Sequence, residues 1–145
     1  MIVADLNETI SPRLASVATT ATVGIAASAL ARLDVGMLVV CNDGGPVVGV
    51  VSKSDLVRHL AGGGTSTANL ASVMTKDVVT CSIRDDLQVV WKKMVDRRLQ
   101  NVPVLNDQAR PVGVLDIRDA LRVLLQEEEY EEQLLVNYVS GIGYR

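Results

Sequence analysis

The stretch Gly49–Leu56 reads GVVSKSDL, and a similar stretch, GVLDIRDA, occupies residues 113–120. The apolar residues of each stretch predict the end of a β-strand, and the polar residues that follow predict the first turn of a helix. Both copies place an aspartate at the same point, Asp55 and Asp119. The two aspartates are 64 residues apart, and a fixed spacing of this kind indicates an internal repeat.

The repeat extends well beyond these two turns. Residues 39–60 align without a gap with residues 103–124, and nine aligned positions are identical. In each copy the pattern predicts a strand, a helix, a two-stranded hairpin and a second helix. We therefore expect an α/β (α+β) fold in which two β-α-β-β-α repeats pack sheet to sheet with approximate two-fold symmetry. One core is expected to be shared, because a single copy is too small to bury enough apolar surface.

The predicted elements follow from local patterns. The first helices are expected to begin after the caps Thr22 and Asp86, and the second helices at Ser52 and Asp116. The predicted strands cover residues 14–17, 37–41 and 47–51 in copy one, and residues 78–81, 102–105 and 112–115 in copy two. The predicted units are a first repeat at residues 3–62 and a flexible linker at residues 63–70. They are followed by a second repeat at residues 71–126 and a C-terminal amphipathic helical tail at residues 127–145.

Composition narrows the class of protein. The 145 residues are 48% hydrophobic and 21% charged, with a net charge of −3, which is typical of a globular domain and gives no general attraction to nucleic acid. Residues 14–31 lack charges but are rich in Thr, Ser and Ala, so we expect no membrane span and a cytoplasmic protein. Cys41 and Cys81 show no metal-ligand spacing, and reduced core thiols are expected.

Two interpretations of the repeated turn remain open. Ser52 followed by Asp55 fits a capping box, in which both side chains serve only to start a helix. The same geometry would also suit a nucleoside phosphate, since a helix N-terminus attracts phosphate and Lys53 or Arg118 would add positive charge. An aspartate one turn into the helix could then accept hydrogen bonds from both hydroxyls of a ribose.

The ordered, doubled set of motifs resembles a tandem CBS-domain pair over residues 3–125. The segment 72–80 (SVMTKDVVT) is similar to the family's lead into its second copy, and residues 101–104 (NVPV) to its second strand. The resemblance implies a stand-alone, non-enzymatic regulatory module with no obligatory cofactor. Such a module would bind an adenosine ligand (AMP, ADP, ATP, possibly NAD or S-adenosylmethionine) between the copies, form a homodimer and signal to a client protein.

The resemblance also implies site residues. Asp55 would hold the ribose of one ligand with Ser52 on its phosphate side, and Asp119 would hold the ribose of the other. The residues expected to border the adenine are Ser16, Val39, Thr80, Val102 and Pro103. Asp116 stands where the family usually has Ser or Thr, so we expect unequal sites. The Asp55 cleft is expected to be the better phosphate site, while the other prefers a less charged ligand, relies on Arg118 or stays empty.

An alternative is a dimerisation or scaffold protein without a nucleotide ligand, whose two turns are only helix caps. The C-terminal tail bears on this alternative, because Tyr130, Leu134 and Tyr138 fall on one face of the predicted helix. We expect that face to pack on the chain's own lobes or on a second subunit, with a client protein as the remaining possibility.

Overall fold

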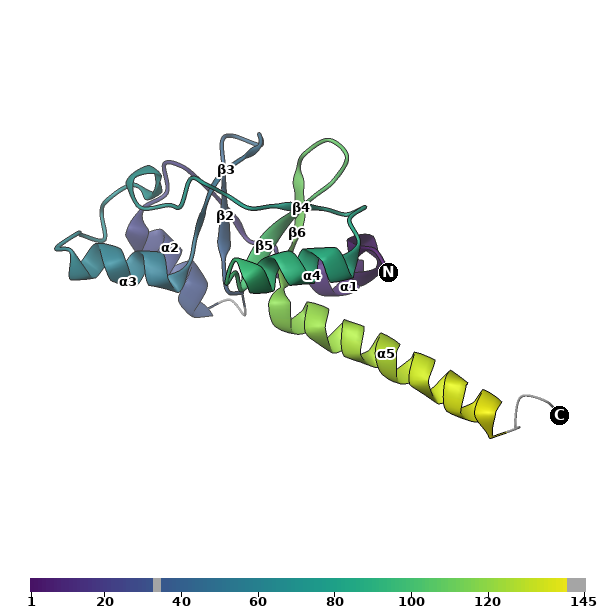
Figure 1. Ribbon diagram of the computed structural model, residues 1–145. Helices are drawn as coiled ribbons and strands as arrows, with labels where there is room; N and C mark the ends of the chain where they lie inside the picture. Colours follow the sequence, from purple (N-terminus) through teal and green to yellow (C-terminus); the bar gives the residue numbers. More distant parts are fainter. Residues whose placement is uncertain (33–34, 141–145) are drawn as a thin grey trace.

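The computed structural model describes residues 1–32 and 35–140, and its strands form two three-stranded sheets flanked by helices (Figure 1). In each sheet the first strand runs parallel to the second, and the second and third form an antiparallel hairpin. The strands are β1 Ser16–Ala18, β2 Leu38–Cys41, β3 Val47–Val51, β4 Cys81–Ser82, β5 Asn101–Leu105 and β6 Pro111–Asp116. The shared topology confirms the predicted repeat.

The helices follow the same repeat. Asp86 caps the fourth helix by accepting hydrogen bonds from the backbone N–H groups of Gln88 and Val89, and the Thr22 hydroxyl accepts one from Ile25. Both predicted caps are therefore confirmed. The helices are α1 Asn7–Ile10, α2 Val23–Arg32, α3 Lys53–Ala61, α4 Leu87–Asp96 and α5 Ile117–Val139, with 3-10 turns η1 Val3–Leu6, η2 Ser11–Arg13 and η3 Leu70–Ser72.

The hairpin strands agree with prediction to within one residue at each end, but the first strand of each copy begins later than expected. The reason is visible in copy one, where the N–H of Leu14 still closes the preceding 3-10 turn by donating to Ser11 O at 3.2 Å. Pairing with β2 therefore begins only around Ser16, the register partner of Val39.

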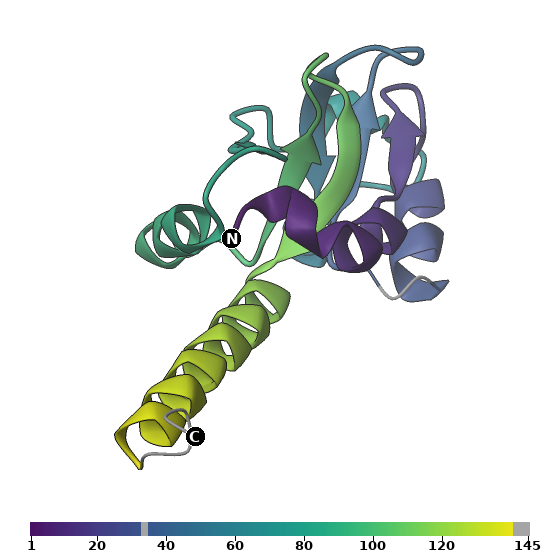
Figure 2. The same cartoon turned by 90° about the vertical axis from the view of Figure 1, so that its right-hand side faces the viewer.

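The buried apolar residues divide into two clusters, one for each sheet and its helices, so the expectation of one shared core is wrong. We call β1–β3 with α2 and α3 the first lobe, and β4–β6 with α4 and α5 the second lobe. Leu38, Val40 and Val51 belong to the first cluster, whereas Val39 and Val50 are buried but outside it. Because side chains alternate along a strand, these two valines point to the opposite face of the sheet. Figure 2 shows the sheets side by side, with helices outside them.

The segments that precede β1 and β4 are exchanged between the lobes. We call residues 3–13 and 67–77 the lead-in segments. Val3 and Ile10 are buried in the cluster of the second lobe, although they precede the first sheet in sequence. Leu70, which precedes the second sheet, is buried in the cluster of the first lobe. Each lobe is therefore completed by the lead-in segment of the other copy.

The linker between the copies is anchored to α2. The N–H of Gly24 donates to Ser66 O at 2.8 Å, and the N–H of Leu70 donates to Ala21 O at 2.9 Å. The glycines at residues 62–64 predicted a flexible connection, but these backbone bonds fix its second half against the start of α2.

The glycine that opens each motif copy lies where a lead-in segment crosses the sheet. A Cβ on Gly113 would lie 2.8 Å from the carbonyl oxygen of Ile10, and one on Gly49 would lie 3.1 Å from that of Thr75. Thr75 also exchanges two backbone hydrogen bonds with Val50, of 2.9 and 3.0 Å. The close approach of another backbone thus excludes a Cβ at Gly113 and leaves little room for one at Gly49.

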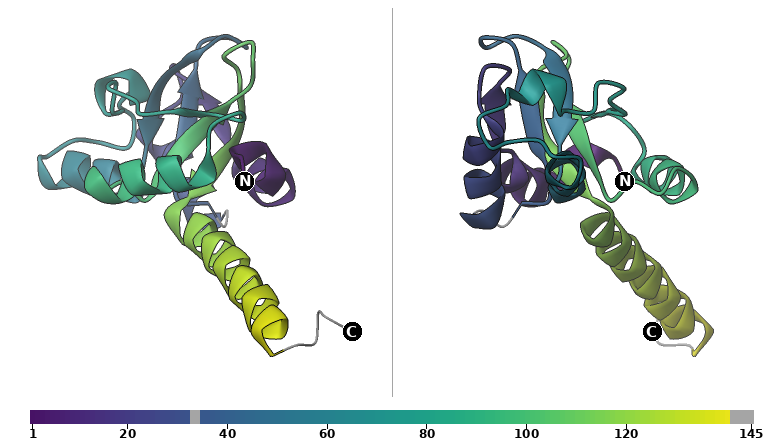
Figure 3. Two further views of the ribbon diagram at one scale, coloured as in Figure 1. Left: turned by 45° about the vertical axis from the view of Figure 1, so that its right-hand side comes forward. Right: turned by 90° about the vertical axis from the view of Figure 1, so that its left-hand side faces the viewer.

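The second helix of copy two and the predicted tail form one helix, α5, of 23 residues. Figures 1 and 3 show its C-terminal half projecting away from both lobes. Tyr130, Leu134 and Tyr138 are exposed, so the expected packing of this face on the chain's own lobes is not found. Within residues 1–32 and 35–140, no helix is both long enough and apolar enough to span a membrane.

Candidate functional site

Asp55 lies at the start of α3, where the two copies meet. It is only 7% exposed, and its Oδ2 accepts hydrogen bonds from the backbone N–H of Ser52 at 2.9 Å and from the Ser52 hydroxyl at 3.1 Å. The backbone bond confirms the predicted capping box. Its Oδ1 accepts a hydrogen bond of 3.2 Å from the hydroxyl of Thr75, in the lead-in segment of copy two. This carboxylate therefore joins the two copies through the hydroxyl of Thr75.

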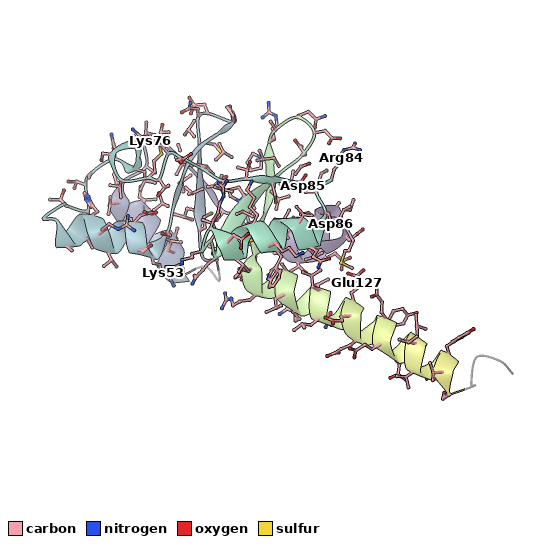
Figure 4. The ribbon with its side chains drawn as sticks, viewed as in Figure 1. Lys53, Lys76, Arg84, Asp85, Asp86 and Glu127 are labelled. Carbon is pink, nitrogen blue, oxygen red and sulfur yellow. The ribbon has the colours of Figure 1, made fainter. Side chains whose placement is uncertain are left out.

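The strands bring other predicted residues to the same end of the first sheet. Ser16 is the register partner of Val39, and Val39 is the partner of Val50, two residues before Ser52. Lys53 is exposed in the first turn of α3 (Figure 4). The side chain of Val39 is fully buried, so it shapes the wall beneath this end of the sheet and offers no exposed surface.

Asp119 occupies the equivalent place in α5 but has different partners. It is 2% exposed, and its Oδ2 accepts a hydrogen bond from Arg13 Nε at 2.6 Å. Its Oδ1 accepts one from Arg13 Nη2 at 3.3 Å and one from Arg122 Nη2 at 2.7 Å. Arg13 belongs to the first lead-in segment, so this carboxylate also joins the two copies, here through guanidinium groups.

Asp116, the N-cap of α5, is paired with Arg118. The carboxylate accepts hydrogen bonds from the Arg118 backbone N–H at 2.8 Å and from its guanidinium Nε and Nη2 at 3.1 and 2.7 Å. Burial disfavours the charged form, but the hydrogen bonds and the charge of Arg118, with a contribution from Arg13, outweigh burial and lower the pKa of Asp116. Arg118 is therefore occupied in neutralising this carboxylate.

The remaining predicted residues of the second lobe do not gather in one place. Thr80 and Val102 line a cavity of 220 Å³ together with Cys81. Pro103 follows Val102 along β5, so its side chain points to the other face of the sheet. Burial, together with the charge of Asp85, raises the pKa of the Cys81 thiol to about 12, against the opposing effect of Lys93. The thiol is therefore protonated at neutral pH.

A second hollow lies between the two hairpins and involves Ser16. It has a volume of 420 Å³, and Ser16, Cys41 and Arg110 are among its lining residues. The Arg110 guanidinium donates a hydrogen bond to the carbonyl oxygen of Gly44 across the gap between the hairpins. Ser16 therefore lies both beside β2 and at this hollow.

Sequence reasoning missed Thr75 and Arg13, the two residues that cross between copies to reach the aspartates. A signal was present for Arg13, because the 64-residue repeat places it opposite Asp77. A reversal of charge at equivalent positions marks a place where the two copies must differ in their interactions.

Comparison with known proteins gives consistent matches. Residues 3–62 and residues 70–126 each match the CBS domain. The "CBS domain-containing protein CBSX3, mitochondrial" of Arabidopsis thaliana is 26% identical over 129 residues, which cover 85% of this chain and 62% of that protein. The chain thus spans less than two thirds of this curated relative.

Several solved structures with the same fold are more than 25% identical. The CBS-domain containing protein ATU1752 from Agrobacterium tumefaciens is 28% identical, with a TM-score of 0.74 over 85% of this chain and 98% of that one. The CBS domain protein PAE2072 from Pyrobaculum aerophilum, solved in complex with AMP, is 27% identical, with a TM-score of 0.74 over 82% and 89%.

Proposed function

The chain belongs to the CBS-domain family, and we propose that it is a regulatory module that binds an adenosine-containing nucleotide in the cleft at Asp55 and signals to a client protein. One observation carries the proposal. Asp55 is a buried carboxylate at a helix N-terminus. The side chains that donate hydrogen bonds to it are the hydroxyls of Ser52 and Thr75. The hydroxyls of a ribose are chemically alike and can take the place of such neutral donors.

The neighbouring groups suit the rest of a nucleotide. The start of α3 offers backbone N–H groups and a partial positive charge to a phosphate, and Lys53 is exposed in the same turn. Ser16 and the β2 backbone near Val39 would border the base. In the second lobe the corresponding roles would fall to Thr80, Val102 and Pro103, but the ion pairs of Asp116 and Asp119 make that cleft the weaker one. The complex of PAE2072 with AMP supports an adenosine ligand.

Calorimetric titration with AMP, ATP, NAD and S-adenosylmethionine tests this function. We expect saturable binding of at least one ligand, weakened about 10- to 100-fold in Asp55→Ala, which is the usual cost of losing a hydrogen bond to a charged group. Asp96→Ala, which removes an exposed aspartate at the end of α4, serves as the matched control and should bind normally. Asp55→Asn provides a second variant if Asp55→Ala does not fold.

The alternative function, a dimerisation or scaffold protein, is favoured by the exposed apolar side chains of α5. If the folded, nucleotide-free protein gives no heat with any of the four ligands, the result would support the scaffold function. Turnover of a bound nucleotide would contradict the proposed regulatory role and indicate an enzyme.

A further inference from the structure

The lead-in segments of the two copies carry opposite charges at equivalent positions. Arg13 in copy one corresponds to Asp77 in copy two, at the 64-residue spacing of the repeat. The arginine one turn after each motif aspartate is the same in both copies, Arg58 and Arg122. Arg13 therefore distinguishes the surroundings of Asp119 from those of Asp55.

Asp119 and Asp55 differ in how closely guanidinium groups contact them. Both oxygens of Asp119 accept from Arg13, and the shortest of these bonds is 2.6 Å. At Asp55, the nearest guanidinium nitrogen is that of Arg58, 3.5 Å from Oδ1, on a side chain that is 75% exposed. Hydrogen bonds between ions are shorter and about twice as strong as those between neutral groups. Asp119 is thus held by two guanidinium groups, those of Arg13 and Arg122, and Asp55 mainly by neutral donors.

We propose that Arg13 blocks the second cleft: its guanidinium pairs with the Asp119 carboxylate, which a ribose would otherwise use. A ribose offers only neutral hydroxyls, so it would replace a charge-assisted pair with weaker bonds. It would also separate the guanidinium of Arg13, which is only 24% exposed, from the Asp119 carboxylate. Because Arg13 is part of the same chain, it competes at a high effective concentration.

This inference rests on the proposed function and sharpens it: the chain binds one nucleotide, at Asp55, because Arg13 closes the second cleft. Arg13 is a specificity-determining residue that acts through Asp119. The lead-in segment that completes the second lobe therefore also sets its ligand preference.

The test counts AMP molecules per chain by calorimetric titration. We expect one for the wild type and two for Arg13→Ser, and the additional site should disappear in Arg13→Ser/Asp119→Ala. Arg84→Ser removes an arginine whose partner, Asp107, lies in the second hairpin, and should leave the count at one. A count of one in both the wild type and folded Arg13→Ser, or of two in the wild type, would overturn the proposal.

A reciprocal variant provides a second readout. Asp77→Arg places a guanidinium at the position in copy two that corresponds to Arg13, where it can pair with Asp55. We expect AMP affinity to fall about tenfold or more, from competition with a charge-assisted bond, while Asp77→Ala binds as the wild type does. Unchanged affinity in folded Asp77→Arg would contradict the proposal, and this variant decides the matter if Arg13→Ser does not fold.

The failures of the two proposals are distinguishable. Binding at Asp55 in the wild type with no gain in Arg13→Ser would overturn only the role of Arg13. Binding in Arg13→Ser but not in the wild type would support that role and overturn the function proposed for Asp55. Absence of binding in every folded variant would overturn both.

Discussion

At the residue scale, contacts with single atoms restrict which amino acid can occupy the first position of each motif. At Gly49 and Gly113 a Cβ would lie only 3.1 and 2.8 Å from a backbone carbonyl oxygen of a lead-in segment. These glycines are therefore contact points between the copies, and their role differs from that of a turn glycine such as Gly44, whose φ is +66°.

Gly113→Ala should lower the free energy of unfolding by about 1–3 kcal/mol, the usual cost of forcing extra atoms into a packed contact. The new Cβ would lie 2.8 Å from the carbonyl oxygen of Ile10, and a backbone cannot move aside as a side chain can. Urea denaturation measures the change. Gly62→Ala is the control, since its Cβ would lie at an ordinary 3.5 Å from Arg58 O. Equal stability of the two variants would contradict this account.

Sequence predicted one half of the candidate site better than the other. Ser52 and Asp55 are three residues apart, so their pairing follows from local helix geometry. Arg13 and Asp119 are 106 residues apart, and only the exchange of lead-in segments brings them together. Local spacing carries no information about such a contact.

Among the elements, α5 behaves unlike the other helices because its two halves have different surroundings. Its first turns carry the buried Asp119 and Ala120, whereas the apolar side chains of its C-terminal half are exposed. The glutamates of residues 127–132 suggested a boundary at the end of the repeat, but Glu is a good helix former. Nothing in that segment interrupts the helix, so the predicted tail continues the second repeat.

Leu135→Ala and Leu115→Ala provide a matched pair for testing whether anything covers α5. Leu115 is fully buried and its truncation should cost about 2–5 kcal/mol of unfolding free energy. Leu135 is 63% exposed in the single chain, so its truncation should change that energy by less than about 0.5 kcal/mol. Thermal unfolding at two protein concentrations checks both values. A loss at Leu135 that is larger at the higher protein concentration and shrinks on dilution would instead show that a second copy covers this face.

The hairpins were the most predictable elements, since alternating valines and the turn residues 42–45 specify strands and connection together. The lead-in helices were not predicted, because segments as short as Asn7–Ile10 carry little periodicity. Their packing on the opposite lobe depends on the tertiary structure of the whole chain.

For the molecule as a whole, the exchange of lead-in segments means that neither lobe is complete without the other copy. The first cluster needs Leu70, and the second needs Val3 and Ile10. Small units that share buried surface in this way are expected to unfold together in one cooperative transition.

Leu70→Ala tests this coupling through the single tryptophan, Trp91, which packs against the cluster of the second lobe. The substitution creates a cavity in the first lobe, yet it should shift the Trp91 fluorescence transition as far as the helical circular dichroism signal. Val57→Ala, on an exposed side chain of α3 in the same lobe, should shift neither. A fluorescence transition that stays in place while circular dichroism shifts would show that the lobes unfold separately.

The continuity of α5 has a mechanical consequence. At 1.5 Å per residue, its 23 residues form a rod about 35 Å long. The rod begins at Asp116 and Asp119, where Arg13 holds the Asp119 carboxylate, and its far end lies outside both lobes (Figure 3). A tilt of about 10° at the cleft would carry the far end through about 6 Å. The start of α5 would thus be the fulcrum of a lever, and the Arg13–Asp119 ion pair holds the helix at that point.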